Sequence, residues 1–272
     1  MKIFIDSADL DEIQEGYDWG VVDGITTNPS LLKKAVEKRI HAGEQIDLKA
    51  YLTRILEIAG KTPVSLEVTE FTAKGMIEQG KRLYKLFNPV AGNVYIKIPV
   101  NPAFKADDNT HVDGIMAIRE LATDGIPVNS TLIFTPEQAL LAAKAGAKFV
   151  SPFAGRIDDD LRMNADLKFD KTEYFPAAGM EIEGMVLEDY GIVSGIDLVD
   201  QCVQIIEQYG FDTEVLAASL RNPRQVRESA LVGAHIATLP LDVIKDMLKH
   251  HKTFEGMELF TADIVQEYVD LS

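Results

Sequence analysis

Residues 127–151 read PVNSTLIFTPEQALLAAKAGAKFVS, and this stretch indicates how the whole chain is organised. A short β-rich apolar run over residues 127–132 is followed by Thr-Pro-Glu at 135–137, which places a proline at the first position of a helix. A second apolar run follows over residues 148–151. Two strands joined by a helix in this way pair in parallel.

The same unit recurs along the chain, because short apolar runs alternate with amphipathic stretches from one end to the other. Eight such units in about 250 residues are typical of a closed barrel, so the sequence predicts an α/β fold, a single-domain (β/α)₈ TIM barrel. A doubly wound open sheet is the alternative. The predicted strands cover residues 2–6, 22–26, 64–68, 93–98, 127–132, 148–151, 214–217 and 235–239.

No linker rich in Gly, Ser and Pro divides residues 1–272, so one domain is expected. Two segments are longer than a bare barrel requires. Residues 33–60 contain a stretch in helical phase, which predicts an extra helix after the second strand. Residues 157–193 carry ten acidic and three basic side chains after the sixth strand. This acidic segment is either a solvated excursion or a lid, since βα connections lie on the active-site face of a barrel.

The end of the chain predicts a final amphipathic helix over residues 261–271. Ile264, Val265, Tyr268 and Val269 would share one side of it. That side can cap this barrel or pack on a neighbouring subunit.

Composition restricts the class of protein. With 46% apolar and 26% charged residues, the chain has the composition of an ordinary globular protein. It has 27 basic and 43 acidic residues, a net charge of −16, which argues against nucleic acid or an anionic membrane as a partner. The single cysteine, Cys202, forms no internal disulfide, and the N-terminal residues resemble neither a secretory signal nor a membrane span. A cytoplasmic protein is therefore expected.

Polar side chains gather at the carboxyl ends of the predicted strands, which meet at one face of a parallel barrel. One polar residue there is explained by contact with water, but seven of the eight strands deliver hydrogen-bonding or ionisable groups, which favours a pocket. The residues at or just after these ends include Asp6, Thr26, Thr27, Asn28, Glu67, Lys97, Asn129, Thr131, Ser151, Phe153, Arg156, Ser219 and Arg221.

Lys97 is the most informative of these residues, because it lies between Ile96 and Ile98 in an otherwise apolar strand. Burial disfavours the ammonium form of a lysine, and the neutral amine is a nucleophile that attacks a carbonyl and leaves an iminium after loss of water. An exposed lysine at a strand end is the alternative interpretation. Glu67 and Asp6 at other strand ends favour the catalytic one, since these steps need proton donors and acceptors.

Other chemistries have less support. Of five histidines, only His235 falls in a predicted strand, and it lies at the start, away from the pocket; a metal-dependent barrel enzyme needs several histidines at strand ends. No glycine-rich nucleotide motif follows a strand. No metal and no cofactor are therefore expected. Arg156 and Arg221 are the candidates for binding an anion.

Several motifs together resemble the transaldolase family, in its branch of small-subunit transaldolases and fructose-6-phosphate aldolases. The likeness follows the chain in order over nearly its whole length, and the Thr-Thr-Asn-Pro and Lys-Ile-Pro motifs are specific in combination. The motifs are FIDSA at 4–8, DGITTNPS at 23–30, YIKIP at 95–99, VSPFAGR at 150–156, LAASLR at 216–221 and ATLP at 237–240.

The resemblance implies a metal-free class I enzyme that forms a Schiff base on Lys97. By that likeness Asp6 is the acid and base for the hydroxyl of the cleaved carbon, and Glu67 with Thr131 manages a catalytic water. The implied substrate-binding residues are Asn28, Asn129 and Ser151 for a three-carbon dihydroxyacetone unit, Arg156, Ser219 and Arg221 for a phosphate, and Thr27 and Phe153 beside them.

The expected activity is transfer of a dihydroxyacetone unit from a ketose phosphate to an aldose phosphate. In the sister fructose-6-phosphate aldolases, glutamine typically stands at the position of Glu67 and tyrosine at that of Phe153, so the residues present here favour the transferase. The alternatives are an aldolase that releases dihydroxyacetone, a transaldolase of sulfonated sugars, and an inactive barrel that binds sugar phosphates. The resemblance also implies a homo-oligomer, with a ring of subunits as a pentamer or decamer.

Overall fold

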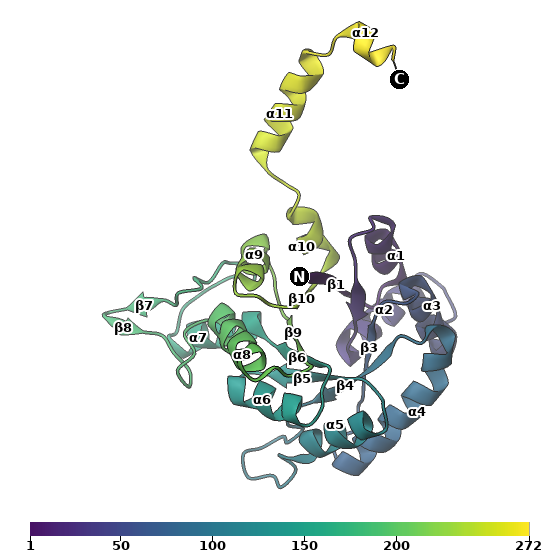
Figure 1. Cartoon of the computed structure of the whole chain (residues 1–272), viewed down its shortest axis with the longest axis vertical. Coiled ribbons are helices and arrows are strands. Elements are labelled where there is room, and N and C mark those ends of the chain that lie inside the picture. Colours follow the sequence, from purple (N-terminus) through teal and green to yellow (C-terminus); the bar gives the residue numbers. More distant parts are fainter. Residues whose placement is uncertain (272) are drawn as a thin grey trace.

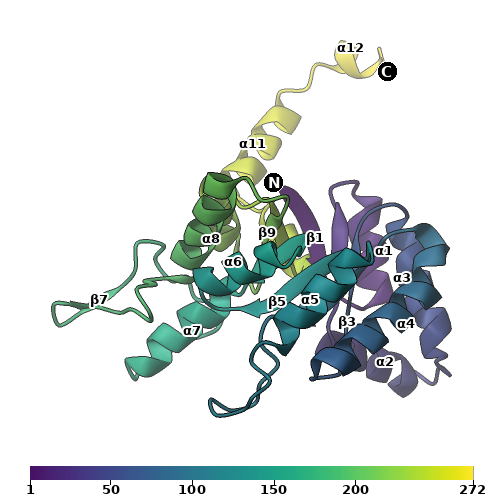
Figure 2. The ribbon, with the colours of Figure 1, turned by 60° about the horizontal axis from the view of Figure 1, so that its bottom comes forward.

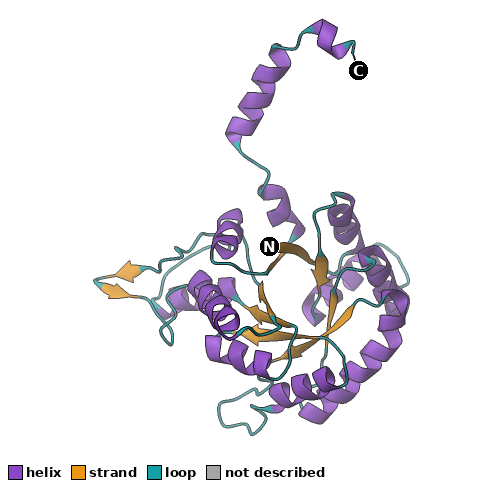
Figure 3. Ribbon diagram, viewed as in Figure 1, coloured by secondary structure: helices purple, strands orange, loops and turns teal. Residues whose placement is uncertain are grey.

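The computed structural model describes residues 1–271 and contains a closed barrel of eight parallel strands surrounded by helices (Figures 1 and 3). The strands are neighbours in chain order, β1-β2-β3-β4-β5-β6-β9-β10, and β10 pairs with β1 to close the barrel. This is the predicted (β/α)₈ TIM barrel. The barrel strands are β1 (Lys2–Asp6), β2 (Gly24–Thr26), β3 (Val64–Glu67), β4 (Val94–Pro99), β5 (Val128–Ile133), β6 (Phe149–Pro152), β9 (Glu214–Ala217) and β10 (Ile236–Leu239).

The helices lie outside the barrel, as the view turned by 60° also shows (Figure 2). Each connection between consecutive barrel strands contains at least one helix, which is what parallel pairing requires. The helices are α1 (Leu10–Asp18), α2 (Pro29–His41), α3 (Leu48–Ala59), α4 (Ala73–Ala91), α5 (Asp113–Thr123), α6 (Pro136–Lys144), α7 (Ala154–Asn164), α8 (Gly195–Tyr209), α9 (Pro223–Leu231), α10 (Leu241–Asp246), α11 (His251–Ala262) and α12 (Gln266–Val269).

Three helices begin with a proline directly after a polar capping residue. Asn28, Thr135 and Asn222 cap α2, α6 and α9, and each side-chain oxygen accepts a hydrogen bond from a backbone N–H in the first turn. The backbone of each capping residue is extended, as expected for a residue before proline. These caps set where the chain turns from strand to helix, at the end of the barrel where the polar residues gather.

The barrel interior is filled by aromatic and aliphatic side chains from alternate strand positions. The ring of Phe149 stacks on Tyr95 with centroids 4.6 Å apart and meets Phe4 edge-on at 5.9 Å. Gly24 makes room for Phe4, because a Cβ at residue 24 would lie 2.6 Å from that ring. Two residues further along β1, β4 and β6, on the same inward face, come Asp6, Lys97 and Ser151. The aromatic layer therefore forms the floor beneath the polar end.

The other face of the strands packs against the helices in one continuous core. Fully buried residues on this face include Ile25, Ile96, Ile98, Val150 and Val215. Burying an aliphatic side chain of this kind contributes about 1.5–3 kcal/mol. The scaffold that carries the strand ends is therefore rigid.

The two long segments take different forms. Residues 33–60 contain the end of α2 and then α3, whose Ile55 and Leu56 are fully buried. Residues 157–193 continue from α7 through a loop and a small hairpin of β7 (Glu181–Ile182) and β8 (Met185–Val186), which projects from the barrel (Figure 1).

The loop after α7 packs against α9. Tyr174 donates to Glu228 at 2.6 Å, and the guanidinium of Arg224 lies 3.6 Å from the Tyr174 ring centroid. Asn222 donates to the carbonyl of Thr172 at 3.3 Å. This part of the acidic segment is thus anchored beside the carboxyl end of β9.

The end of the chain differs from the single helix expected over residues 261–271. Helix α11 already begins at His251 and ends at Ala262, and the short α12 spans Gln266–Val269. Neither helix buries a residue, and both lie away from the barrel (Figures 1 and 2). This tail, residues 250–271, therefore does not cap its own barrel. Within residues 1–271, no helix is both long and apolar enough to span a bilayer.

Candidate active site

A polar cavity of about 150 Å³ opens at the carboxyl ends of the barrel strands. It contains residues from β1, β2, β4, β6, β9 and β10, so side chains far apart in sequence converge there. Seven of the predicted site residues line it. The lining residues are Asp6, Thr26, Asn28, Lys97, Ser151, Phe153, Arg156, Leu216, Ala218, Ser219 and Thr238.

Lys97 lies at the base of this cavity, and its side chain is only 6% exposed. Its Nζ lies 3.0 Å from Oε2 of Glu67 and donates to the carbonyl oxygen of Thr27 at 3.1 Å. Glu67 and Lys97 are direct neighbours in the register of β3 and β4. The buried ammonium is thus paired with a carboxylate, which offsets part of the cost of its desolvation.

Asp6 lies at the end of β1, three strands from β4 around the barrel, and lines the same cavity as Lys97. Burial raises the pKa of Asp6 above its ordinary value, while the charge of Lys97 and a hydrogen bond from Thr26 oppose that rise. Thr26 Oγ1 donates to Oδ1 of Asp6 at 2.7 Å and lies 2.5 Å from Oγ1 of Thr238. A carboxyl group in this setting holds a proton at higher pH than a free aspartate does.

Thr238 was not among the predicted site residues, and Thr26 was noted only as a strand-end residue. Both face the cavity because of strand periodicity. Thr26 lies two residues before Asn28, and Thr238 lies two residues after the buried Ile236. Counting in twos along each strand from an inward residue would have placed both in the site.

The amides of the site are held by neighbours. The Oδ1 atom of Asn28 accepts the backbone N–H of Leu31 at 2.9 Å, so capping α2 fixes this side chain and leaves its NH₂ group for the cavity. Asn129 donates to Ser65 Oγ at 3.0 Å and accepts from Ser151 Oγ at 2.7 Å. This chain of hydrogen bonds sets the direction of the Ser151 hydroxyl, which faces the cavity.

Thr131 is fully buried on β5, two residues after Asn129. Its Oγ1 atom has no hydrogen-bond partner among residues 1–271. A buried hydroxyl without a partner costs free energy, so a hydrogen bond to a water at this position would be favourable.

The two predicted anion-binding arginines have different surroundings. Arg156 is exposed, and its guanidinium lies over Phe153, 5.2 Å from the ring centroid. It has no salt bridge within residues 1–271, whereas Arg221 makes a two-pronged pair with Asp159. Arg221 does not line the 150 Å³ cavity. It lines an adjoining cavity of about 510 Å³ that Arg156 also borders.

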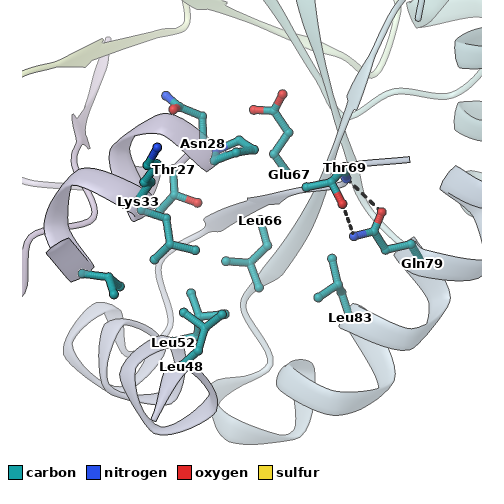
Figure 4. Close-up of a pocket in the computed structure, with 13 residues that line it drawn as sticks. Thr27, Asn28, Lys33, Leu48, Leu52, Leu66, Glu67, Thr69, Gln79 and Leu83 are labelled. Carbon is teal, nitrogen blue, oxygen red and sulfur yellow. Dashed lines mark hydrogen bonds between the residues drawn. The ribbon is translucent and has the colours of Figure 1, made fainter. Parts of the chain in front are cut away.

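A third cavity, of about 390 Å³, lies on the outer side of Glu67 between β3 and helices α2, α3 and α4 (Figure 4). Its floor is apolar and includes Leu48 and Leu52 from α3. Thr69 and Gln79 bind each other at one edge, with Thr69 N donating to Oε1 at 2.8 Å and Nε2 donating back to Oγ1 at 3.0 Å. The predicted residues Thr27 and Glu67 face this cavity.

The predicted site residues therefore fall into four groups. Asp6, Asn28, Lys97, Ser151, Phe153, Arg156 and Ser219 line the central cavity. Glu67 and Thr27 contact Lys97 from the side of the apolar cavity, while Asn129 and Thr131 are buried on β5. Arg221 lies in the adjoining cavity. No cluster of three or more His, Cys, Asp or Glu side chains within residues 1–271 has a geometry suited to a metal ion.

A (β/α)₈ barrel with a buried lysine paired to a carboxylate in a polar cavity at its strand ends has the architecture of a barrel enzyme, whose active site lies at that face. Residues 3–270 match the family model described as Transaldolase/Fructose-6-phosphate aldolase, so the chain belongs to that family of transferases and aldolases.

Curated relatives agree with this assignment over almost their whole lengths. A probable transaldolase of Desulfatibacillum aliphaticivorans is 43% identical over 263 residues, which cover 97% of each chain. One from Chlorobium phaeobacteroides strain BS1 is 42% identical with the same coverage. One from Aquifex aeolicus strain VF5 is 38% identical and covers 97% of this chain and 96% of its own.

Proposed function

We propose that this chain transfers a dihydroxyacetone unit from a ketose phosphate to an aldose phosphate through a Schiff base on Lys97. The observation that carries this proposal is the position of Lys97 Nζ, which is buried at the base of a polar cavity and 3.0 Å from a carboxylate. Membership of the family and the names of the relatives support the general reaction.

In the first step, Lys97 gives up a proton and its amine attacks the ketose carbonyl. Glu67 is near enough to accept that proton directly. The carbinolamine that forms loses its hydroxyl as water, and the product is an iminium. The stacked rings of Tyr95 and Phe149 close the barrel below Lys97. The substrate can therefore approach Lys97 only through the cavity above it.

In the second step, the bond between the third and fourth carbons breaks. The proton of the hydroxyl on the fourth carbon passes to the Asp6 carboxylate, the bonding electrons move into the iminium to give an enamine, and an aldehyde leaves. Burial raises the pKa of Asp6, so this carboxyl can retain the proton and return it when an acceptor aldehyde is attacked.

The three-carbon unit stays bound through Lys97 while the acceptor enters. The NH₂ group of Asn28 and the hydroxyl of Ser151 are placed to bind its hydroxyl groups. Hydrolysis of the new iminium consumes the water released at the start. Thr131, whose hydroxyl has no partner among residues 1–271, and Glu67 would hold that water.

The phosphate of the sugar would bind at the cationic side of the cavity. The chain has a net charge of −16, so attraction of an acidic sugar depends on a few fixed cations. Arg156 borders both the central and the adjoining cavity, and Ser219 and Arg221 lie beside it. The same geometry accepts a sulfonate, which assays with both kinds of sugar would distinguish.

The second candidate is an aldolase that releases free dihydroxyacetone. The ring of Phe153 lies at the cavity beside Arg156 and carries no hydroxyl that could protonate the enamine. This observation favours the transferase.

We also propose that the enzyme works as a homo-oligomer in which the tail packs on a second copy. Several large apolar side chains of the tail are more than half exposed, among them Phe260, Val265 and Tyr268. Apolar surface of this extent on one projecting segment is typical of an interaction site.

Borohydride trapping tests the Schiff base. Reduction of the enzyme in the presence of fructose 6-phosphate should add a three-carbon adduct to Lys97, as peptide mapping by mass spectrometry will show. Lys97→Met should abolish both adduct and turnover, whereas the matched Lys33→Met, a lysine at the edge of the apolar cavity, should keep both. An adduct on another lysine, or none in an active preparation, would refute the proposal and favour a binding barrel.

A further inference from the structure

Arg221 is held from several sides by the protein itself. Its Nη1 and Nη2 donate to Oδ1 and Oδ2 of Asp159 at 2.5 and 2.7 Å. Nη1 also donates to the carbonyl of Lys171 at 3.2 Å, and Nη2 lies 3.5 Å from Ser219 Oγ. The arginine and aspartate side chains are 18% and 10% exposed, so this pair is little screened by solvent.

The contacts with Asp159 occupy the end of the guanidinium that bears both terminal nitrogens. This is a two-pronged pair of parallel hydrogen bonds, which fixes the plane of the group as well as its position. The side edge of the guanidinium, formed by Nε and the outer hydrogen of Nη2, makes no bond to Asp159. Among residues 1–271, Nε donates no hydrogen bond, and the contact of Nη2 with Ser219 Oγ is long, at 3.5 Å.

Gly155 gives the guanidinium room to lie against the start of α7. A Cβ at residue 155 would lie 3.0 Å from Nε and 3.2 Å from Cζ of Arg221, and 2.2 Å from the carbonyl oxygen of Ser219. Any side chain there would therefore displace both the arginine and the backbone of the residue beside the open edge.

The backbone of Arg221 is fixed through Asp158, the residue before Asp159. Arg221 N donates to Oε1 of Gln225 at 2.8 Å, and Nε2 of Gln225 donates to Asp158 at 2.7 Å. Two consecutive residues of α7 thus hold both ends of one arginine. Asp160, the next residue, makes no bond to Arg221 but lines the same cavity. Asp166, just beyond α7, is exposed and lines neither cavity that holds an arginine.

We propose that Asp159 is a positioning residue for the substrate anion: it holds Arg221 so that its side edge and Ser219 face the phosphate. The inference rests on the proposed role of Arg221 in binding the phosphate. An arginine fixed in advance loses little side-chain entropy on binding, whereas a free arginine must be ordered by the ligand. Asp159 itself touches no substrate in this arrangement.

The test compares Asp159→Asn with the matched control Asp166→Asn, which removes the same charge from an exposed residue outside both cavities that the arginines line. Transfer is measured from fructose 6-phosphate and from fructose, with glyceraldehyde as an acceptor without phosphate. In Asp159→Asn, KM for fructose 6-phosphate should rise at least tenfold, while kcat and the KM for fructose stay within twofold. Asp166→Asn should leave both values of KM within twofold of the parent enzyme.

Two further variants separate positioning from a general loss of structure. Asp159→Glu keeps the charge and both acceptors, so it should recover part of the lost affinity for fructose 6-phosphate. In an Arg221→Ala background, Asp159→Asn should add less than a twofold change, since Asp159 acts through Arg221. Thermal unfolding of each variant, and dihydroxyacetone trapped on Lys97 with borohydride, show that the barrel and the Schiff base are intact.

Three outcomes would overturn the inference. An equal rise in KM for both sugars would mean a structural role, and a fall in KM for fructose 6-phosphate would mean that Asp159 competes with the phosphate. If Arg221→Ala raised KM equally for both sugars, the assignment of Arg221 and the inference would fail together. The Schiff-base proposal would survive that result, because trapping on Lys97 is independent of it.

Discussion

Lys97 Nζ and Glu67 Oε2 lie 3.0 Å apart across the register of two neighbouring barrel strands. The two side chains are 6% and 16% exposed, so each charge depends on the other. Breaking such a pair by removing one partner leaves an uncompensated buried charge. The glutamate therefore has both a structural and a chemical effect on the lysine.

Glu67→Gln is expected to lower kcat for transfer by about 10²–10⁴-fold, the range of general acid–base catalysis. Glutamine keeps an acceptor for the ammonium but cannot take a proton from it. Steady-state transfer assays measure the loss, and borohydride trapping with dihydroxyacetone should still label Lys97, although more slowly. An unchanged kcat would remove Glu67 from the proton transfers.

Phe153→Tyr is expected to raise the release of free dihydroxyacetone from fructose 6-phosphate in the absence of an acceptor. The added hydroxyl would lie at the rim of the cavity, where it can protonate the enamine. The parent enzyme should release little dihydroxyacetone until an aldose phosphate is added. If the variant released no more than the parent, the absence of a hydroxyl at residue 153 would not explain the preference for transfer.

Arg156→Lys and Arg221→Lys are both expected to weaken binding of the phosphorylated sugar, but only Arg221→Lys is expected to lower the stability of the fold. Each should weaken the binding of a phosphorylated ketose by about 1–3 kcal/mol and so raise its KM, because lysine cannot form the two-pronged pair with a phosphate. Arg221→Lys should also lower the melting temperature, since it breaks the pair with Asp159, whereas Arg156 has no salt bridge to lose within residues 1–271. Thermal unfolding and kinetics on sugars with and without phosphate measure both effects. Equal melting temperatures would contradict the difference.

The sequence predicted the parts of the site that depend on local pattern. Lys97 stood out because a charge interrupts an apolar strand, and Asn28 because a proline follows it. Thr238 did not stand out, since its position in the site depends on counting in twos from a buried residue and on closure of β10 against β1. The pairing of Arg221 with Asp159 was not predictable, because it joins residues 62 positions apart where the start of α7 contacts the chain just after β9.

The extent of the tail helices was not predictable for a related reason. Periodicity within residues 261–271 predicts an amphipathic helix, but it does not show where that helix begins or what it packs on. The structure places the start of α11 at His251, and its apolar residues Phe254, Met257 and Phe260 are exposed together with those beyond it. What these side chains pack on depends on contacts outside one chain, which local periodicity does not encode.

Deletion of residues 251–272 is expected to reduce the size of the particle in solution. The full chain should be larger than a dimer by multi-angle light scattering at micromolar concentration, and the shortened chain should be smaller and equally well folded by circular dichroism. Burial of the exposed apolar side chains against a second copy is the physical reason. A monomeric full chain would contradict the oligomer, and an unchanged size after deletion would show that the tail does not hold it together.

Asp158 is expected to make stability depend on pH between about 4 and 6. Burial raises the pKa of Asp158 from its ordinary 3.8 to about 6, although hydrogen bonds from Gly195 and Gln225 and the charges of Arg162 and Arg221 oppose the rise. The folded chain therefore binds the proton more tightly than the unfolded chain does. The stabilisation from this proton is fully present below pH 4 and is lost as the pH rises to about 6, in total about 3 kcal/mol.

Asp158→Asn isolates that contribution, because the amide does not titrate and any fixed cost of the substitution shifts all pH values equally. The free energy of unfolding, measured by urea denaturation of both proteins, gives their difference at each pH. Relative to the variant, the parent enzyme should lose about 3 kcal/mol of stability between pH 4 and pH 7. A difference that stayed constant over this range would mean that Asp158 carries its charge in the folded barrel as readily as in the unfolded chain. In that case the bonds from Gly195 and Gln225, together with the two arginines, would fully compensate its burial beside the arginine site.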